Sequence, residues 1–226
     1  VDVPADPRAT WVLPPPGERT ARGIILANGL PDRLPDGDWV EAAIECGALR
    51  LCPICDAYEA TDTRIGVYGA AQAIAGHALF LRTFSRRVFL IPSHSPRETD
   101  EPALREALAA GVDLLPGGGS LGFDATRCHY TAPDGTSTVL DSLYPFLGSL
   151  SAAGFATGTG VALNDEGEID VDAEQMTTVP TLFAIGDAVT GLKQISVAVG
   201  QAAVAATTAH DRLPFVPRDK STKASA

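Results

Sequence analysis

Two cysteines and an aspartate stand together in this sequence, in the order Cys52-Pro53-Ile54-Cys55-Asp56. Thiols separated by two residues can close a small disulfide ring that is readily reduced. If a helix begins at the pair, its N-terminus lowers the pKa of the first thiol and favours the reactive thiolate. Asp56 can then return a proton to a leaving thiolate as a general acid. The pattern predicts a redox-active disulfide.

A zinc site and a structural disulfide without chemistry are the alternatives for this pair. Zinc needs a second pair of ligands at suitable spacing, and the adjacent Cys128 and His129 provide poor spacing, so we predict no metal site. The four cysteines of the chain are too few for a secreted disulfide scaffold, which favours a reducing, cytoplasmic compartment. Cys46 and Cys128 are interpreted as buried or incidental thiols. On the motif alone, a structural pair stays open.

Two glycine-rich stretches compete for the role of a nucleotide-binding turn. Residues 117–122 fit the pattern G-x-G-x-x-G, but loop and strand residues follow them, so we predict a turn between strands. Residues 69–74 have the expected context, because a strand over 64–68 precedes them and a helix over 70–84 follows. A strand over 87–91 completes a βαβ unit of the kind that binds nucleotides.

The chemistry of this second stretch is incomplete. Gly69 provides the tight turn, but Ala71 stands where a glycine lets the backbone approach a pyrophosphate, and Ile74 occupies the sixth position. NADPH selectivity usually needs an arginine near the end of the next strand, where only Arg97 is available. The candidate NAD(P) contacts are Gly69, Ala71 and Gln72, and a fold that no longer binds nucleotide is the open alternative.

A third candidate site follows a buried strand expected over 181–185. The strand ends in Gly186, which lets the backbone approach a ligand, and Asp187, which can accept a hydrogen bond from a sugar-like hydroxyl. A helix rich in Ala and Val is expected over 194–212, and its N-terminus offers free N–H groups to an electron-rich ring edge. An ordinary strand–loop–helix with a capping aspartate is the alternative.

Composition narrows the class of partner. The formal net charge of −11 argues against nucleic acid and anionic membranes, and no apolar run reaches the roughly 20 residues that span a bilayer. The chain starts at Val1 in a Pro-rich stretch, which indicates a missing N-terminal segment.

The remaining elements expected from the sequence are short. Strands are expected over 9–13, 22–27, 111–115, 126–131 and 137–144, with a strand pair within 151–170. Helices are expected over 102–110 and 39–46, the last with Asp38 as its N-cap.

The order of these motifs resembles the low-molecular-weight thioredoxin reductases and their relatives among pyridine nucleotide–disulfide oxidoreductases. That family has Ala-Thr-Gly, Cys-x-x-Cys-Asp, Phe-Ala-x-Gly-Asp and Arg-Gln-(Ile/Val) in the same order. The resemblance covers residues from about 20 to 212. The matching residues here are Ala27-Asn28-Gly29, Cys52 to Asp56, Phe183 to Asp187, and Lys193-Gln194-Ile195.

The resemblance implies an α/β fold in which a Rossmann-like nucleotide-binding domain is inserted into an FAD-binding domain with a parallel sheet. Residues 1–35 and 148–226 would belong to the FAD domain, and residues 36–147 would form the NAD(P)-type domain with the cysteine pair. The implied FAD contacts are Ala27, Asn28, Gly29, Gly186, Asp187, Lys193, Gln194 and Ile195, with Asp187 on the ribityl chain and Gln194 and Ile195 at the pyrimidine edge.

The resemblance also implies a reaction. Cys55 would be the thiol nearest the flavin, Cys52 would exchange with the substrate, and Asp56 would be the acid. The partner would be a thioredoxin-like protein or a small-molecule disulfide or dithiol, and the protein would be a homodimer.

Two departures from the family's motifs leave three functions to be distinguished. The N-terminal FAD loop, a G-x-G-x-x-G, is absent from the chain, and Pro92, Ser93 and His94 replace the arginines that hold the 2′-phosphate of NADPH. A reductase fed by NAD(P)H, a flavin dithiol oxidase or a reductase with another electron donor, and a flavin-free binding module are therefore the competing expectations.

Overall fold

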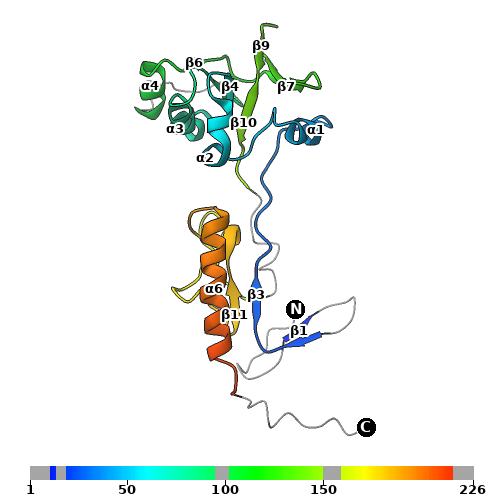
Figure 1. Cartoon of the computed structure of the whole chain (residues 1–226), viewed down its shortest axis with the longest axis vertical. Helices are drawn as coiled ribbons and strands as arrows, with labels where there is room; N and C mark the ends of the chain where they lie inside the picture. Colours follow the sequence, from blue (N-terminus) through cyan, green and yellow to red (C-terminus); the bar gives the residue numbers. More distant parts are fainter. Residues whose placement is uncertain (1–10, 14–18, 95–101, 150–158, 216–226) are drawn as a thin grey trace. The chain divides into compact units, whose positions relative to one another are not determined.

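The computed structural model describes residues 11–13, 19–94, 102–149 and 159–215 (Figure 1). The chain divides into two compact units, one formed by residues 1–31 with 149–226 and the other by residues 32–148. We refer to them as unit 1 and unit 2. Arg97 and the first part of the predicted 151–170 segment lie outside the described residues.

Unit 2 is built on a parallel sheet in the order β10-β4-β5-β6. Its strands carry apolar residues on both faces, as expected where helices or a second sheet cover them. On one face, α3 packs against β4 and β5, and α4 packs against α3. The strands are β4 (Arg64–Gly69), β5 (Arg87–Pro92), β6 (Asp113–Leu114) and β10 (Ser142–Phe146), and the helices are α3 (Ala71–Leu81) and α4 (Pro102–Ala109). The predicted βαβ unit is therefore confirmed.

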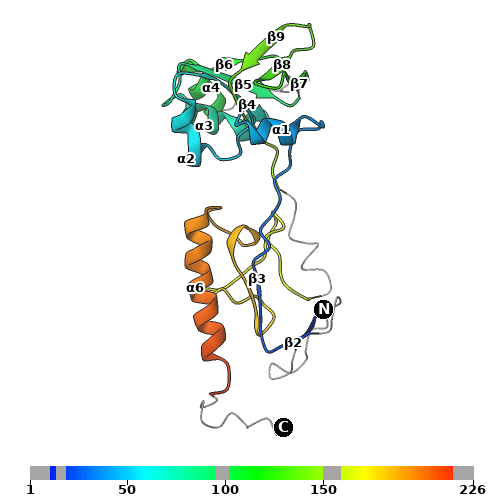
Figure 2. The same cartoon turned by 45° about the vertical axis from the view of Figure 1, so that its right-hand side comes forward.

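Unit 2 also contains a three-stranded antiparallel sheet (Figure 2). It consists of β7 (Ser120–Phe123), β8 (Cys128–Thr131) and β9 (Ser137–Leu140), and it shares a buried apolar cluster with α1 (Val40–Glu45). Because β7 follows the glycines at 117–119 directly and pairs with β8, this stretch is a turn between strands, as predicted.

Unit 1 contains a two-stranded parallel sheet, β3 (Ile24–Leu26) with β11 (Leu182–Ala184), and the long helix α6 (Ile195–Asp211). Phe183 on β11 is 1% exposed and joins a buried cluster with Ala205 of α6. The short strands β1 (Trp11–Leu13) and β2 (Arg19–Ala21) form an antiparallel pair. An isolated bridge between Leu163 and Ile169 supplies the expected pairing after residue 158.

One predicted helix cap is wrong. The sequence predicts Asp38 as the cap of α1, but the N-cap residue is Trp39, and no side chain makes a capping hydrogen bond there. The Trp39 indole folds back over Gly37, where a Cβ atom would lie 2.2 Å from its Nε1. In the described part of the chain, no helix combines the length and apolar character needed to cross a membrane.

Candidate active site

The cysteine pair sits at the start of the short helix α2 (Pro53–Asp56) in unit 2. Cys52 is the N-cap residue and Pro53 follows at the first helical position, where its missing N–H costs nothing. The amides of Cys55 and Asp56 donate to the Cys52 carbonyl at 3.0 and 3.2 Å. Cys52 and Cys55 are joined by a disulfide, with their Cα atoms 5.3 Å apart. A helix therefore begins at the pair, which meets the condition set by the sequence for a helix N-terminus beside the first thiol.

Small buried residues hold this helix while its cysteines stay accessible. Pro53 is buried, and Ala57, at 1% exposure, begins the 3-10 helix η1 (Ala57–Ala60) as part of the main core of unit 2. Cys55 is exposed and Cys52 is partly exposed. A thiol of a partner molecule can therefore reach the disulfide from solvent.

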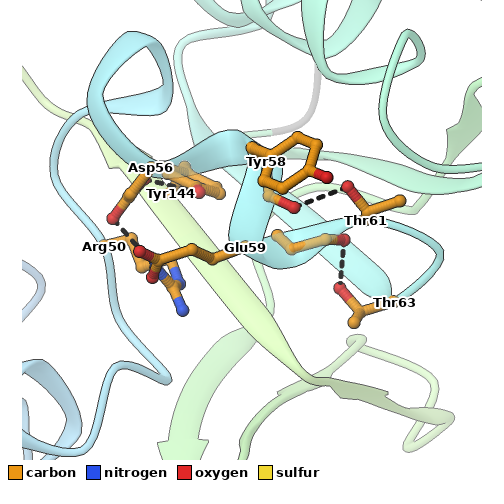
Figure 3. A network of polar contacts seen from close by, with 8 residues as sticks. Arg50, Asp56, Tyr58, Glu59, Thr61, Thr63 and Tyr144 are labelled. Carbon is orange, nitrogen blue, oxygen red and sulfur yellow. Dashed lines mark hydrogen bonds and ion pairs between the residues drawn. The ribbon is translucent and has the colours of Figure 1, made fainter.

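Asp56 is fixed by contacts from two other elements (Figure 3). The Tyr144 hydroxyl, on β10, donates to Asp56 Oδ1 at 2.8 Å. Arg50, in the loop before α2, places Nη1 3.0 Å from Asp56 Oδ2 and 3.0 Å from Glu59 Oε2. Each Asp56 oxygen thus accepts one hydrogen bond. We call Arg50, Asp56, Glu59 and Tyr144 the Asp56 network.

The Asp56 network shifts the pKa of two of its donors upward. Burial raises the pKa of Tyr144, and its hydrogen bond to Asp56 raises it further, so the phenol keeps its proton and remains a donor. Burial alone would lower the pKa of Arg50, but the hydrogen bonds to Glu59 and Asp56 outweigh it, and the net shift is upward. The guanidinium therefore remains a full positive charge beside the carboxylates.

Sequence reasoning missed Arg50 and Tyr144. Tyr144 lies 88 residues from Asp56 along the chain and reads as one more apolar position in a buried strand. Arg50 precedes the cysteine motif by only two positions, but a single arginine in a loop is usually a solvated charge. The available signal is the polar tip of a tyrosine in a buried strand, because a buried hydroxyl needs a partner.

The structure brings the predicted flavin contacts of unit 1 together at one edge of its sheet. Ala27, Asn28 and Gly29 directly follow β3, and Gly186 and Asp187 directly follow β11 and Ile185. Because the two strands are parallel, both segments leave at their carboxyl ends, where ligands bind in open α/β sheets.

A tight turn follows β11 at this edge. Gly186 has φ of +69°, a left-handed conformation that glycine adopts without strain, and its N–H donates to Gln201 Oε1 of α6 at 2.7 Å. Asp187 is partly exposed. An accessible carboxylate at this edge is a group that can accept hydrogen bonds from the hydroxyls of a flavin nucleotide.

The start of α6 completes this cluster. Lys193 forms an ion pair with Glu168, with Nζ 2.7 Å from Oε1, and also donates to the Val189 carbonyl. Gln194 is the N-cap residue, and its Nε2 donates to the Lys193 carbonyl at 2.8 Å. Ile195 is 85% exposed. We refer to these residues, with 27–29 and 186–187, as the β3/β11 edge.

The predicted NAD(P) contacts lie on the turn between β4 and α3 in unit 2. Gly69 ends β4, while Ala71, partly exposed, and Gln72, exposed, occupy the first turn of α3. A Cβ at Gly69 would lie 2.4 Å from the Phe146 carbonyl oxygen and 2.8 Å from Ile74 Cγ2. The fully buried Ile74 therefore packs closely against Gly69 within the core of unit 2.

The end of β5 borders the same turn. The Ser93 amide donates to the Gly69 carbonyl at 2.8 Å, and the Ser93 hydroxyl lies 3.0 Å from His94 Nδ1. These two side chains stand where the resemblance implies arginines. Neither carries the permanent positive charge that a 2′-phosphate favours.

The other two cysteines differ sharply in accessibility. Cys46 is exposed, whereas Cys128 is fully buried on β8. Burial raises the pKa of the Cys128 thiol to about 12, so it is protonated and unreactive at neutral pH. Iodoacetamide added to the folded, oxidised protein is expected to label Cys46 and to leave Cys128 unmodified, as measured by peptide mass mapping. Label at Cys128 before unfolding would contradict this placement.

Comparisons with known proteins agree with these features. Residues 17–202 match the family described as pyridine nucleotide-disulphide oxidoreductase. The thioredoxin reductase of Peptoclostridium acidaminophilum is 26% identical over 228 residues, which cover 92% of this chain and 70% of that protein. An alkyl hydroperoxide reductase protein of Xanthomonas campestris pv. phaseoli is 30% identical over 172 residues, or 72% of this chain and 32% of that protein.

Solved structures show the same fold. The crystal structure of HlmI is 25% identical, with a TM-score of 0.70 over 86% of this chain and 61% of its own. The thioredoxin reductase of Streptococcus pyogenes MGAS5005 is 22% identical, with a TM-score of 0.74 over 88% of this chain and 68% of its own. The chain spans less than two thirds of some of these relatives. The predicted α/β, two-domain FAD/NAD(P)-binding fold class is confirmed, and the chain belongs to the pyridine nucleotide-disulphide oxidoreductase family.

Proposed function

We propose that this protein is a flavin-dependent oxidoreductase that passes electron pairs between FAD and a disulfide or dithiol through Cys52 and Cys55. The observation that carries the proposal is the bonded, solvent-accessible cysteine pair at the start of α2, next to the fixed carboxylate of Asp56. Family membership supports it, because disulfide chemistry gives the family its name. Exposed disulfides are more often labile or catalytic than structural.

FAD is the proposed cofactor, and the β3/β11 edge is its proposed contact surface. Asp187 would hold a ribityl hydroxyl, and the backbone at Gln194 and Ile195 would face the pyrimidine edge of the ring, close to the positive end of α6. Bound FAD would supply an acceptor or donor for one electron pair. Ala27, Asn28, Gly29, Gly186 and Lys193 are the other proposed FAD contacts at this edge.

The cysteine chemistry can be written without the cofactor. In the reducing direction, a Cys52 thiolate attacks a partner disulfide, a mixed disulfide forms, and the leaving partner sulfur takes a proton. The Cys55 thiolate then attacks Cys52 Sγ and releases the partner as a dithiol. Two electrons and two protons reach the partner, and the Cys52–Cys55 disulfide is restored. The same steps run backwards oxidise a dithiol.

The proposed partner is a thioredoxin-like protein or a small-molecule disulfide or dithiol. The names of the relatives support a disulfide or peroxide-linked redox chain, since they include thioredoxin reductases and alkyl hydroperoxide reductases. A homodimer and a cytoplasmic location are proposed on the family resemblance.

A second candidate is a dithiol oxidase that does not use NAD(P)H. The observation in its favour is the turn after β4, where Ala71 and Ile74 stand at positions that the nucleotide-binding pattern gives to glycine. Ser93 and His94 add no fixed positive charge to this turn.

The electron donor can be identified by anaerobic mixing of the flavin-loaded protein with NADPH, NADH or dithiothreitol. If the turn after β4 no longer binds nucleotide, dithiothreitol removes the visible flavin absorbance and the two nucleotides leave it unchanged. Rapid bleaching by either nucleotide would instead establish a reductase of the NAD(P)H-fed kind. A purified full-length protein without flavin absorbance would contradict the proposed function itself.

A further inference from the structure

An ion pair in unit 1 joins one of the proposed FAD contacts, Lys193, to a turn that the proposed function does not use. Lys193 Nζ lies 2.7 Å from Glu168 Oε1 and also donates to the Val189 carbonyl. The Lys193 side chain is 36% exposed and the Glu168 side chain 18% exposed. A pair that is partly shielded from solvent in this way contributes more to local structure than a pair of fully solvated side chains.

Glu168 closes a tight turn over residues 164–168 that its own side chains hold in shape. Asn164 Oδ1 accepts hydrogen bonds from the backbone N–H groups of Glu166 and Glu168, at 3.0 and 2.8 Å. The backbone N–H of Asn164 donates to the Glu168 carbonyl at 2.9 Å, and Asn164 Nδ2 donates to Glu168 Oε2, also at 2.9 Å. The turn therefore presents the Glu168 carboxylate in a fixed orientation.

This turn is attached to the part of the chain between residues 188 and 193, which we call segment 188–193. At the start of the segment, the Ile169 N–H donates to the Ala188 carbonyl at 2.8 Å. In its middle, Asn164 Nδ2 donates to Thr190 Oγ1 at 3.0 Å. At its end stands the ion pair already described. The 164–168 turn thus holds the segment along its length.

The charges of the ion pair compensate each other within unit 1. Burial alone would raise the pKa of Glu168, but its hydrogen bonds from Lys193 and Asn164 outweigh burial, so the pKa is lowered and the group is a carboxylate at neutral pH. Two of the three donors of the Lys193 ammonium point to Glu168 and to the Val189 carbonyl. The side chain of Lys193 is therefore committed to the protein rather than to a ligand.

Segment 188–193 connects two of the proposed FAD contacts, Asp187 and Gln194. We propose that Lys193 and Glu168 are positioning residues for FAD, because their ion pair fastens segment 188–193 to the 164–168 turn. Asp187, at the ribityl chain, and the backbone at the start of α6, at the pyrimidine edge, are then held at the spacing that one cofactor needs. The inference rests on the proposed function and deepens it, since the Lys193 side chain acts through the protein and only its backbone is left for FAD.

A loose segment would weaken the binding of FAD for an entropic reason. Ordering a free stretch of backbone costs conformational entropy at each residue, and a segment that is ordered in advance removes this cost from binding. Differences of this kind between related complexes appear mostly in the dissociation rate. Loss of the ion pair is therefore expected to speed the release of FAD.

The test measures how fast FAD leaves the full-length protein after dilution, from the rise in flavin fluorescence. Glu168→Gln keeps the shape of the side chain, but its NH2 group has to face Lys193 or Asn164, which are both donors. Lys193→Met keeps the apolar stem and removes the ammonium. Each variant is expected to release FAD about tenfold faster than the wild type. Because the two residues act as one unit, the double variant is expected to show about tenfold as well, not a hundredfold.

The ion pair between Arg212 and Glu174 provides the matched control. It also lies in unit 1, with Arg212 Nη2 2.8 Å from Glu174 Oε2, but it is at the other end of α6 and its side chains are 44% and 55% exposed. Arg212→Met should change the rate of FAD release by less than about twofold.

Hydrogen exchange of the flavin-free protein gives a readout that does not depend on the cofactor. Peptides over segment 188–193 should exchange at least about threefold faster in Glu168→Gln and Lys193→Met than in the wild type. Peptides over β11 should exchange at the wild-type rate, which distinguishes a loosened segment from a destabilised unit 1.

Three results would overturn the inference while leaving the proposed function intact. They are wild-type FAD release from Glu168→Gln, unchanged exchange over segment 188–193 in both single variants, and release about a hundredfold faster from the double variant. The last result would show that Lys193 acts on FAD independently of Glu168. A wild-type protein that holds no FAD would instead contradict the proposed function, and the role of the ion pair toward FAD with it.

Discussion

Cys55→Ser is expected to abolish electron transfer between dithiothreitol and bound flavin, with a loss of at least about a thousandfold in rate. A serine hydroxyl cannot form or break a disulfide, so the variant can form a mixed disulfide through Cys52 but cannot resolve it. The exposed position of Cys55 at the first turn of α2 makes the substitution structurally mild. Stopped-flow absorbance under anaerobic conditions measures the loss.

Cys46→Ser is the matched control for this variant. Cys46 is also exposed, but it forms no disulfide and lies at the end of α1. Its replacement should leave the rate unchanged within about twofold. If Cys55→Ser transferred electrons as fast as the wild type, the cysteine pair would not be on the electron path and the proposed chemistry would be wrong.

Gly69→Ala is expected to destabilise unit 2 by about 1–3 kcal/mol, as overpacking of a close contact does. Its new methyl group would lie 2.4 Å from the Phe146 carbonyl oxygen, where backbone cannot give way as a flexible side chain can. Gly69 and Phe146 are paired residues of β4 and β10, so the methyl would push these strands apart at the end that carries the nucleotide turn. Chemical denaturation measures the change.

Gly76→Ala on the neighbouring helix α3 is the matched control, and it is expected to increase the free energy of unfolding rather than decrease it. Nothing lies within 4 Å of the position that its Cβ would take, and the residue is in the interior of α3. Alanine there should stabilise the helix by about 0.5–1 kcal/mol. Equal stability of the two variants would show that the close approach of β4 and β10 at Gly69 has no energetic consequence.

Local sequence patterns are sufficient for the elements that carry the site. The spacing of Cys52 and Cys55 predicts the disulfide, because the two cysteines lie within one turn of the chain. The strand–helix–strand over residues 64–92 is predictable for the same reason: its apolar periodicity is local. The wrong cap at Asp38 shows the limit, because the helix begins one residue later than the sequence indicates.

Contacts between distant segments account for the rest. The pairing of β3 with β11 joins residues about 160 positions apart, and only the family resemblance points to the edge they form. The hydrogen bond from Tyr144 to Asp56 depends on the register of β10 beside β4, which no local pattern specifies. Ile74 is visible in the sequence as a departure from a glycine motif, but its packing against Gly69 requires the fold.

The most direct test of a flavin-coupled disulfide is an anaerobic dithionite titration that counts electrons per bound FAD. A flavin and a disulfide that exchange electrons each take up one electron pair. The wild type should therefore consume two pairs per FAD before excess reductant appears. The double variant Cys52→Ser/Cys55→Ser should consume one. A wild type that takes up only one pair per flavin would contradict the coupling of the Cys52–Cys55 disulfide to FAD.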